Sequence, residues 1–173
     1  YLINKDFDSI FFVQKRIGKD GQEFDFYKFR SMIPNADEIL FKMLDEDKEL
    51  AREYKKNKKL KNDPRITKIG KVLRRTSLDE LPQLINILIG EMSFVGPRPV
   101  VDGEIEKYGM YKNKLLSVTP GLTGWWACNG RSCTSYDERI KLELYYVDHK
   151  SIMLDIKTLF RTFKTVIKGH GAK

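Results

Sequence analysis

Cysteine and histidine are scarce in this chain of 173 residues, which contains two of each. Cys128 and Cys133 are too few for a disulfide scaffold, and they indicate a reducing compartment. The two histidines, His149 and His170, lie far from the cysteines along the sequence. We therefore expect unpaired thiols and no cysteine–histidine metal centre.

Long apolar runs are also missing, so no segment of the sequence is suited to cross a bilayer, and no signal peptide is present. The chain begins at Tyr1 and not at a methionine, from which we expect a domain truncated at its N-terminus, with any membrane segment in the missing part. A hydrophobic content of 41% argues against disorder. Residues 1–173 are most simply one domain with a real core.

Positive charge, by contrast, is abundant. The net charge of +8 predicts a polyanionic partner, which is nucleic acid, an anionic membrane surface or a phosphorylated substrate. Residues 42–61 are dominated by charge and end in a lysine run without interleaved aromatics or a glycine-rich loop. The run is most simply a solvated face, with a nucleic-acid patch as the alternative.

A β-hairpin is predicted near the N-terminus. Residues 9–17 and 23–30 are rich in aromatic and β-branched side chains, and the Asp20-Gly21 pair between them is a turn signal. Period two places two aromatics and two cations on one face of the second strand: Phe24, Phe26, Lys28 and Arg30. This face is either an anion-binding surface or a solvated strand end.

The rest of the chain is expected to be mostly helical, so the predicted class is α+β. Asn35 with Glu38, and Ser135 with Glu138, have the spacing of a helix cap and its partner. The last helix, over residues 151–168, has a basic and an apolar stripe, and lies either on an anionic bilayer or on the protein core. Asp155 lies at the edge of its apolar stripe, where it requires an arginine or a metal ion from elsewhere, or forms a structural salt bridge.

The central stretch, residues 74–99, places arginines and two adjacent carboxylates around one short helix. The helix has an apolar stripe at helical spacing: Leu81, Leu84, Ile85, Leu88 and Ile89. Ser77 and Glu80 have the spacing of a capping box, which would put Asp79 in the first turn. If Pro82 is instead the first helical residue, Asp79 and Glu80 lie on the loop that enters the helix. In both cases the two carboxylates lie at a helix mouth, where the spacing alone favours ordinary capping.

Six ordered motifs carry a family resemblance over nearly the whole chain. They are Tyr27-Lys28-Phe29-Arg30-Ser31-Met32, Ser77-Leu78-Asp79-Glu80-Leu81-Pro82-Gln83-Leu84, Met92-Ser93-Phe94-Val95-Gly96-Pro97-Arg98-Pro99, Pro120-Gly121-Leu122-Thr123-Gly124-Trp125, Asn129-Gly130-Arg131 and Leu154-Asp155-Ile156-Lys157. Together they resemble the bacterial sugar transferase family, the monotopic polyprenyl-phosphate phosphoglycosyl transferases. The family's N-terminal re-entrant helix is absent from this sequence.

The resemblance implies transfer of a sugar-1-phosphate from a UDP-sugar to undecaprenyl phosphate, with Mg²⁺ as cofactor and UMP as product. Such a step initiates exopolysaccharide, capsule or glycan synthesis at the cytoplasmic face of the bacterial plasma membrane. The implied partners are therefore these two substrates and the membrane surface, and not nucleic acid. A basic nucleic-acid-binding module or a membrane-surface scaffold remains the alternative function.

The resemblance also assigns roles to residues. Asp79 is the expected nucleophile, which forms an aspartyl-phosphosugar, and Glu80 is the expected Mg²⁺ ligand with Asp79 beside it. A further set is expected around the phosphates and the carboxylates: Lys28, Arg30, Arg74, Arg98, Arg131 and the supporting carboxylate Asp155. Adjacent carboxylates argue against a glycosidase, in which the two carboxyl groups lie about 5–10 Å apart across the sugar bond.

Overall fold

The computed structural model describes residues 10–57, 60, 62–130 and 134–167. Its strands are β1 (Phe11–Ile17), β2 (Glu23–Phe29), β3 (Ser93–Val95) and β4 (Gly121–Thr123). Its α-helices are α1 (Ala36–Glu46), α2 (Lys48–Asn57), α3 (Lys68–Thr76), α4 (Gln83–Leu88), α5 (Lys112–Leu116), α6 (Trp125–Cys128), α7 (Tyr136–His149) and α8 (Ile152–Ile167). Three 3₁₀ segments complete the order: η1 (Lys19–Gly21), η2 (Leu78–Glu80) and η3 (Ile105–Tyr111). The predicted α+β class is confirmed.

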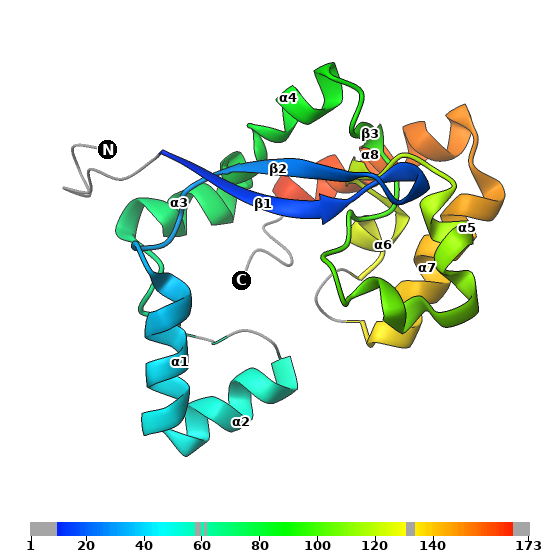
Figure 1. The fold of residues 1–173 in the computed structure, drawn as a ribbon. Helices are drawn as coiled ribbons and strands as arrows, with labels where there is room; N and C mark the ends of the chain where they lie inside the picture. The colour runs from blue at the N-terminus through cyan, green and yellow to red at the C-terminus, as the bar shows by residue number, and fades with distance from the viewer. Residues whose placement is uncertain (1–9, 58–59, 61, 131–133, 168–173) are drawn as a thin grey trace.

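The N-terminal hairpin forms as predicted. Strands β1 and β2 pair antiparallel, with Phe11 opposite Phe29 and Ile17 opposite Glu23. Asp20 and Gly21 both have positive φ angles, 54° and 78°, which fits the Asp-Gly turn. In Figure 1 the hairpin is a long ribbon that runs from the α3 side of the molecule to the α5 and α7 side. It therefore joins the two ends of the domain.

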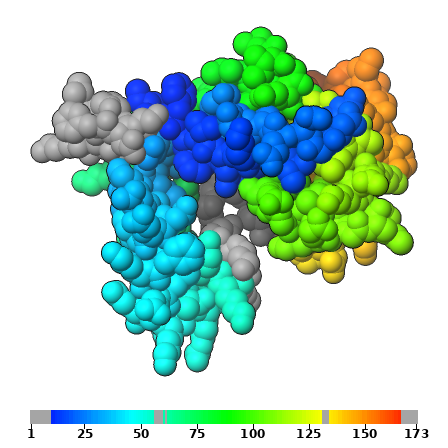
Figure 2. All heavy atoms as spheres, viewed as in Figure 1, coloured from blue at the N-terminus to red at the C-terminus, as the bar shows by residue number. Residues whose placement is uncertain are grey.

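Helices α1 and α2 form a projection away from the hairpin, which stays distinct in the space-filling view (Figure 2). Asn35, before α1, is left-handed and its side chain makes no capping hydrogen bond, so the predicted cap is wrong there. Ser135, before α7, does form the predicted capping box with Glu138.

Among the described residues, the core consists of three small clusters rather than one continuous layer. The first contains Val100, Ile105, Tyr108 and Leu115; the second Phe24, Phe26 and Met92; and the third Val95, Tyr146 and Leu154. The second cluster confirms that Phe24 and Phe26 share the inward face of β2. The third joins α7 and α8 to the short parallel pair of β3 and β4.

Glycines allow β3 and β4 to come together. A Cβ atom on Gly121 would lie 2.0 Å from the backbone N of Gly96, and one on Gly96 would lie 2.5 Å from Thr119 O. No side chain fits at such distances, so the two loops touch backbone to backbone. This contact places the Gly-Pro-Arg-Pro segment beside the Gly-Leu-Thr-Gly segment.

Helix α4 packs by its polar face. Gln83 and Asn86 are 2% and 0% exposed, whereas the apolar stripe of the helix is between 38% and 86% exposed: Leu81, Leu84, Ile85, Leu88 and Ile89. The side chain of Asn86 accepts from Tyr27 N at 3.3 Å and donates to Asp25 O and Glu91 Oε2, both at 2.7 Å. These bonds fix α4 to β2 and turn its apolar stripe outward, where α4 rises above the hairpin (Figures 1 and 2).

Replacing Asn86 by aspartate is expected to destabilise the fold by roughly 3 kcal/mol, because Asp25 O loses its donor and two carboxylates then face each other. Urea unfolding followed by circular dichroism measures the change. Asn113→Asp, at an exposed position of α5, is the matched control and should unfold like the parent protein. Equal unfolding midpoints for the two variants would contradict the anchoring role of Asn86.

Helix α8 also leaves its apolar stripe in the open. Leu154 and Thr158 are its buried positions, at 9% and 0% exposure. Its exposed apolar side chains are Ile152, Met153, Ile156, Leu159, Phe160 and Phe163. The prediction that this stripe packs on the protein core is therefore wrong, and the bilayer alternative stays a prediction. No helix in the described ranges is long and apolar enough to cross a membrane.

Candidate active site

Asp79 and Glu80 lie in a 3₁₀ turn between α3 and α4, and not in the first turn of a capped helix. Ser77 ends α3 with a left-handed backbone (φ 57°) and makes no side-chain cap bond, so the predicted capping box is wrong. Pro82, which has no N–H to donate, precedes the first residue of α4. The alternative placement of both carboxylates on the segment that enters the helix is observed, although the helix begins at Gln83 and not at Pro82.

Lys28 reaches from β2 to Glu80. Its Nζ lies 2.8 Å from Glu80 Oε1, and the two side chains are only 20% and 19% exposed. Burial lowers the pKa of Lys28, and the neighbouring Glu80 carboxylate opposes that effect. The Lys28 ammonium also lies 5.3 Å from the centre of the Phe26 ring. Of the two cations on this face of β2, Lys28 is thus part of the candidate site.

Asp79 is half-buried, and three charged groups act on the pKa of its carboxyl. Burial raises the pKa of the Asp79 carboxyl, opposed by Lys28 and Arg74 and reinforced by Glu80. Arg74 is anchored by its Nε, which donates to Ser31 Oγ at 2.8 Å. Burial lowers the pKa of Arg74, and Asp79 acts to raise it. A carboxylate with little water around it and cations on one side is suited to attack an electrophile.

Arg98 approaches the same place from the Gly-Pro-Arg-Pro segment. Its backbone N–H donates to Glu143 Oε1 at 3.3 Å, and Arg16 Nη1 donates to Pro99 O at 3.1 Å. These two bonds hold the backbone on each side of the Arg98 side chain. The segment therefore presents the guanidinium from a fixed backbone.

A buried network stands behind that segment. Glu143, 2% exposed, also accepts from the Tyr108 hydroxyl and from Arg139 Nε at 3.3 Å. Arg139 Nη1 in turn donates to Glu104 Oε1 at 2.7 Å. Burial raises the pKa of Glu143, while Arg139 and Tyr108 oppose the shift. The network ties α7 to η3 and to the backbone of Arg98.

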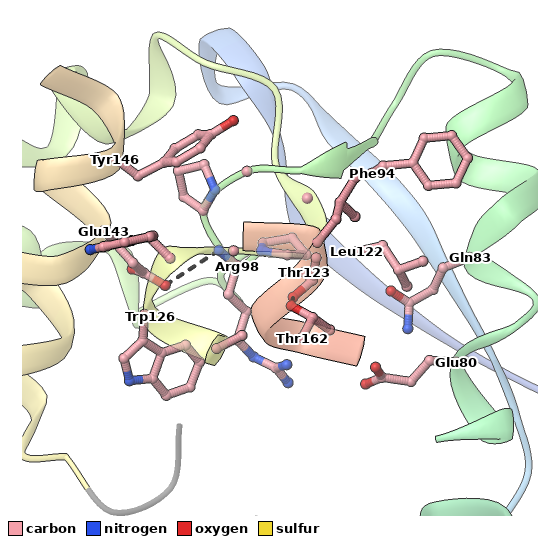
Figure 3. Close-up of a pocket in the computed structure, with 18 of the residues that line it drawn as sticks. Glu80, Gln83, Phe94, Arg98, Leu122, Thr123, Trp126, Glu143, Tyr146 and Thr162 are labelled. Carbon is pink, nitrogen blue, oxygen red and sulfur yellow. Dashed lines mark hydrogen bonds between the residues drawn. The ribbon is translucent and has the colours of Figure 1, made fainter. Parts of the chain in front are cut away.

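A cavity of about 280 Å³ lies beside Glu80 and Arg98, between α4, the β3–β4 loops, α6 and α8. Figure 3 shows the Arg98 and Glu80 side chains at one side of it, with Phe94, Leu122 and Trp126 around it. Both tryptophans of the chain, Trp125 and Trp126, line it. The cavity lining is therefore mixed, with Glu80, Arg98 and several hydroxyl groups among apolar side chains.

Asp155 has a different partner from those expected. The Tyr146 hydroxyl lies 2.7 Å from Asp155 Oδ1 and 3.1 Å from Val95 O. The predicted arginine, metal ion or salt bridge is thus replaced by a tyrosine, since a hydroxyl satisfies a half-buried carboxylate without a second charge. Asp155 supports the cavity through Tyr146, which lines it, and is not itself part of the lining.

Two expected residues are not placed at the cavity by the described part of the chain. Arg30 follows β2, and its backbone N–H donates to Ile10 O at 2.8 Å; the residue is not part of the cavity lining. Arg131 lies outside the described residues. The roles expected for both stay predictions.

The donor set allows one mode of metal binding. Within the described ranges, no group of three or more histidine, cysteine, aspartate or glutamate side chains could hold a metal ion. Mg²⁺ in phosphoryl-transfer sites is commonly held by one or two carboxylates together with substrate phosphates and water. Asp79 and Glu80 fit that mode, in which the substrate completes the site.

Sequence reasoning assigned no site role to Gln83 or Glu143. Gln83 lines the cavity from the buried face of α4, and the available signal was its spacing with Asn86, three residues later on the face opposite the apolar stripe. For Glu143 the only local signal was Arg139 one turn earlier, since its other partners are distant in sequence.

The family model for bacterial sugar transferases matches residues 2–169. An undecaprenyl-phosphate galactose phosphotransferase of Salmonella typhimurium is 44% identical over 172 residues, which is 99% of this chain and 36% of the relative. A UDP-galactose-lipid carrier transferase of Erwinia amylovora is 43% identical, with the same coverage. The exopolysaccharide production protein ExoY of Sinorhizobium fredii is 43% identical over 96% of this chain and 74% of its own length.

The chain spans about a third of the length of the first two relatives. The match nevertheless extends over nearly all of this sequence and includes every segment that builds the cavity. The resemblance read from the six motifs is confirmed, and the chain belongs to the bacterial sugar transferase family.

Proposed function

We propose that this chain is the catalytic domain of a phosphoglycosyl transferase that moves a sugar-1-phosphate from a UDP-sugar to undecaprenyl phosphate. The observation that carries the proposal is the Asp79-Glu80 pair, which has Lys28 and Arg74 beside it and whose Glu80 lines a cavity together with Arg98. The names of the relatives, which refer to undecaprenyl phosphate, UDP-galactose and exopolysaccharide production, support these substrates. The product would initiate exopolysaccharide, capsule or glycan synthesis.

The first step is a displacement at the sugar-bearing phosphorus. An Asp79 carboxylate oxygen attacks this β-phosphorus, the bond to the bridging oxygen breaks, and UMP leaves with that oxygen. The enzyme then carries an aspartyl-phosphosugar. Lys28, Arg74 and Arg98 are close enough to this turn to stabilise negative charge on the phosphoryl oxygens.

The second step regenerates the carboxylate. A phosphate oxygen of undecaprenyl phosphate attacks the same phosphorus, the Asp79–phosphorus bond breaks, and a lipid diphosphate-linked sugar forms. Two displacements replace one direct transfer between two anions. Mg²⁺, held by Glu80 and Asp79, would neutralise charge on the diphosphate when bound. The Lys28 contact fixes the position of the Glu80 carboxylate.

The test of the function is release of UMP. The protein is incubated in membranes or micelles with Mg²⁺, undecaprenyl phosphate and a panel of UDP-sugars, and UMP and the lipid product are measured together. Product formation with at least one sugar is expected. Absence of UMP with every sugar, together with salt-dependent retention of oligonucleotides, would favour the nucleic-acid-binding alternative.

A membrane surface is the proposed location, at the cytoplasmic face of the plasma membrane. Two helices, α4 and α8, both turn apolar stripes outward, and α8 adds Lys157, Arg161 and Lys164. Exposed apolar surface of this extent, next to positive charge, suits an anionic bilayer.

Replacing Leu88 and Phe160 by glutamine is expected to weaken binding to phosphatidylglycerol vesicles at least tenfold. The two side chains are 86% and 74% exposed, and transfer of each into an apolar phase is worth roughly 1.5–3 kcal/mol. Vesicle co-sedimentation measures the change. Met110→Gln, also 86% exposed but in η3, is the control. Equal binding by the double variant and the control would contradict this membrane face.

A further inference from the structure

Gln83 carries a buried donor without a partner. Its side chain is 2% exposed, and its Nε2 makes no hydrogen bond to any described residue. Two arginine nitrogens share this condition, Arg16 Nε and Arg139 Nη2, but neither arginine lines the cavity. An unpaired buried donor costs about 1–3 kcal/mol, so its presence calls for a ligand that accepts from it. Figure 3 shows Gln83 extending from α4 toward the cavity, above Glu80.

The cavity has a lining of mixed polarity. Its charged and amide groups include Glu80, Gln83 and Arg98, and hydroxyl groups come from Thr123, Thr162 and Thr165. Its apolar side chains include Phe26, Phe94, Leu122, Trp125 and Leu159. The apolar side chains offer a surface to a hydrocarbon, and the charged and amide groups offer one to an anionic group.

The mouth of the cavity continues onto the exposed apolar helices. Leu81, Phe94 and Leu159 all line the cavity, yet they are 47%, 55% and 43% exposed, so they form its rim. Leu81 leads to the apolar stripe of α4, and Leu159 belongs to that of α8. A hydrocarbon chain longer than the cavity would therefore emerge between the apolar surfaces of α4 and α8.

We propose that this cavity binds the acceptor lipid, a polyprenyl phosphate. The cavity holds the part of the hydrocarbon chain that lies next to the phosphate. Gln83 Nε2 donates to a phosphate oxygen there, and Arg98 supplies the opposite charge. The identification of the head group as a phosphate rests on the transferase function proposed above. Glu80 does not prevent this arrangement, because Lys28 pairs with it.

A neutral donor is suited to a site that fills and empties. A buried lysine or arginine without its anion would cost far more than a buried amide. Gln83 thus recognises the phosphate, and the empty cavity stays stable. Glu80, the neighbour of Asp79, lines the cavity, so the lipid is placed near the nucleophile for the second displacement.

The binding test uses the two tryptophans, which both line the cavity. The protein is titrated with farnesyl phosphate, a short polyprenyl phosphate, and tryptophan fluorescence is recorded. A saturable change is expected with farnesyl phosphate, a weaker one with farnesol, and none with inorganic phosphate at the same concentrations. Gln83→Leu is expected to weaken farnesyl phosphate about 10- to 100-fold, the range for a lost hydrogen bond to a charged group, and to leave farnesol unchanged.

Matched variants separate the amide from the cavity. Gln22→Leu makes the same change at an exposed position of the hairpin turn and should bind like the parent protein. Leu122→Phe fills the cavity and should weaken farnesyl phosphate and farnesol together, whereas Met110→Phe, in η3, should weaken neither. If Gln83→Leu fails to fold, Leu122→Phe and farnesol still decide the question.

Two outcomes would overturn the lipid site. One is equal binding of farnesyl phosphate by the parent, Gln83→Leu and Leu122→Phe proteins. The other concerns the kinetics of Gln83→Leu: its release of UMP without lipid would fall as much as its turnover with both substrates. The expected kinetic result is a raised KM for the lipid in Gln83→Leu, with the lipid-independent burst of UMP preserved. A protein that binds farnesyl phosphate as described but never releases UMP would retain the lipid site and refute only the transferase.

Discussion

Asp79→Asn is expected to lower sugar-phosphate transfer by roughly 10³-fold or more, because an amide oxygen cannot form the acyl phosphate of the first displacement. The measurement is UMP release, in single-turnover and steady-state assays with the parent's best UDP-sugar. Asp45→Asn, the same change at an exposed position of α1, should keep full activity. Turnover of Asp79→Asn near that of the parent would refute the nucleophile.

The same substitution is expected to stabilise the folded protein. Burial raises the pKa of Asp79, so ionisation costs more in the folded state than in the unfolded chain. The cost is complete above the folded pKa and disappears as the pH falls toward the ordinary value for aspartate. The thermal midpoint of Asp79→Asn should therefore exceed that of the parent at neutral pH, and the two should converge in acid. Loss of activity with a lower midpoint at neutral pH would instead indicate damage to the fold.

Lys28→Met should lower kcat by about 10²- to 10³-fold, the usual effect of removing one group that stabilises transition-state charge. The variant also leaves Glu80, 19% exposed, without its 2.8 Å ion pair. UMP release over a range of UDP-sugar concentrations separates kcat from KM. Because the methionine packs beside Phe26 as the lysine stem does, the fold should survive.

The hairpin supplies a control for that variant. Lys15 of β1 pairs with Asp25 of β2 at 2.9 Å, but the Lys15 side chain is 66% exposed. Exposed pairs contribute little to stability, so Lys15→Met should behave like the parent protein. Similar activities for Lys28→Met and Lys15→Met would show that the Lys28 charge has no role in the reaction.

The hairpin and the capped start of α7 could be predicted because their signals are local. An Asp-Gly turn between alternating strands, and Ser135 with Glu138, each act within a few residues. The same spacing predicted a capping box at Ser77 that does not form, because Ser77 ends α3 in a left-handed conformation. A spacing rule does not register whether the preceding residues already form a helix.

The orientation of α4 could not be predicted from its pattern. Periodicity identifies an apolar stripe but not the side that faces the protein, and burial of that stripe is the usual outcome. Here Asn86 finds its partners on β2, about sixty residues earlier in the chain. Only the folded structure brings these groups together.

The candidate site was located through motifs rather than through spacing. The structure brings Lys28 to Glu80 and places Arg74 and Arg98 around the same turn. It gives Asp155 a tyrosine partner that no helical periodicity could have indicated. Residue types thus predicted the kind of chemistry, whereas the contacts that hold each group depend on segments distant in sequence.

The contact between Asn86 and β2 has a consequence for self-association. A two-stranded ribbon has free edges, and unpaired N–H and C=O groups along an edge can pair with a strand of another molecule. On β2, Asn86 occupies the N–H of Tyr27 and the C=O of Asp25, the groups that an added strand would use. One side chain thus closes the middle of this edge to intermolecular sheet formation, so loss of Asn86 would promote aggregation as well as unfolding.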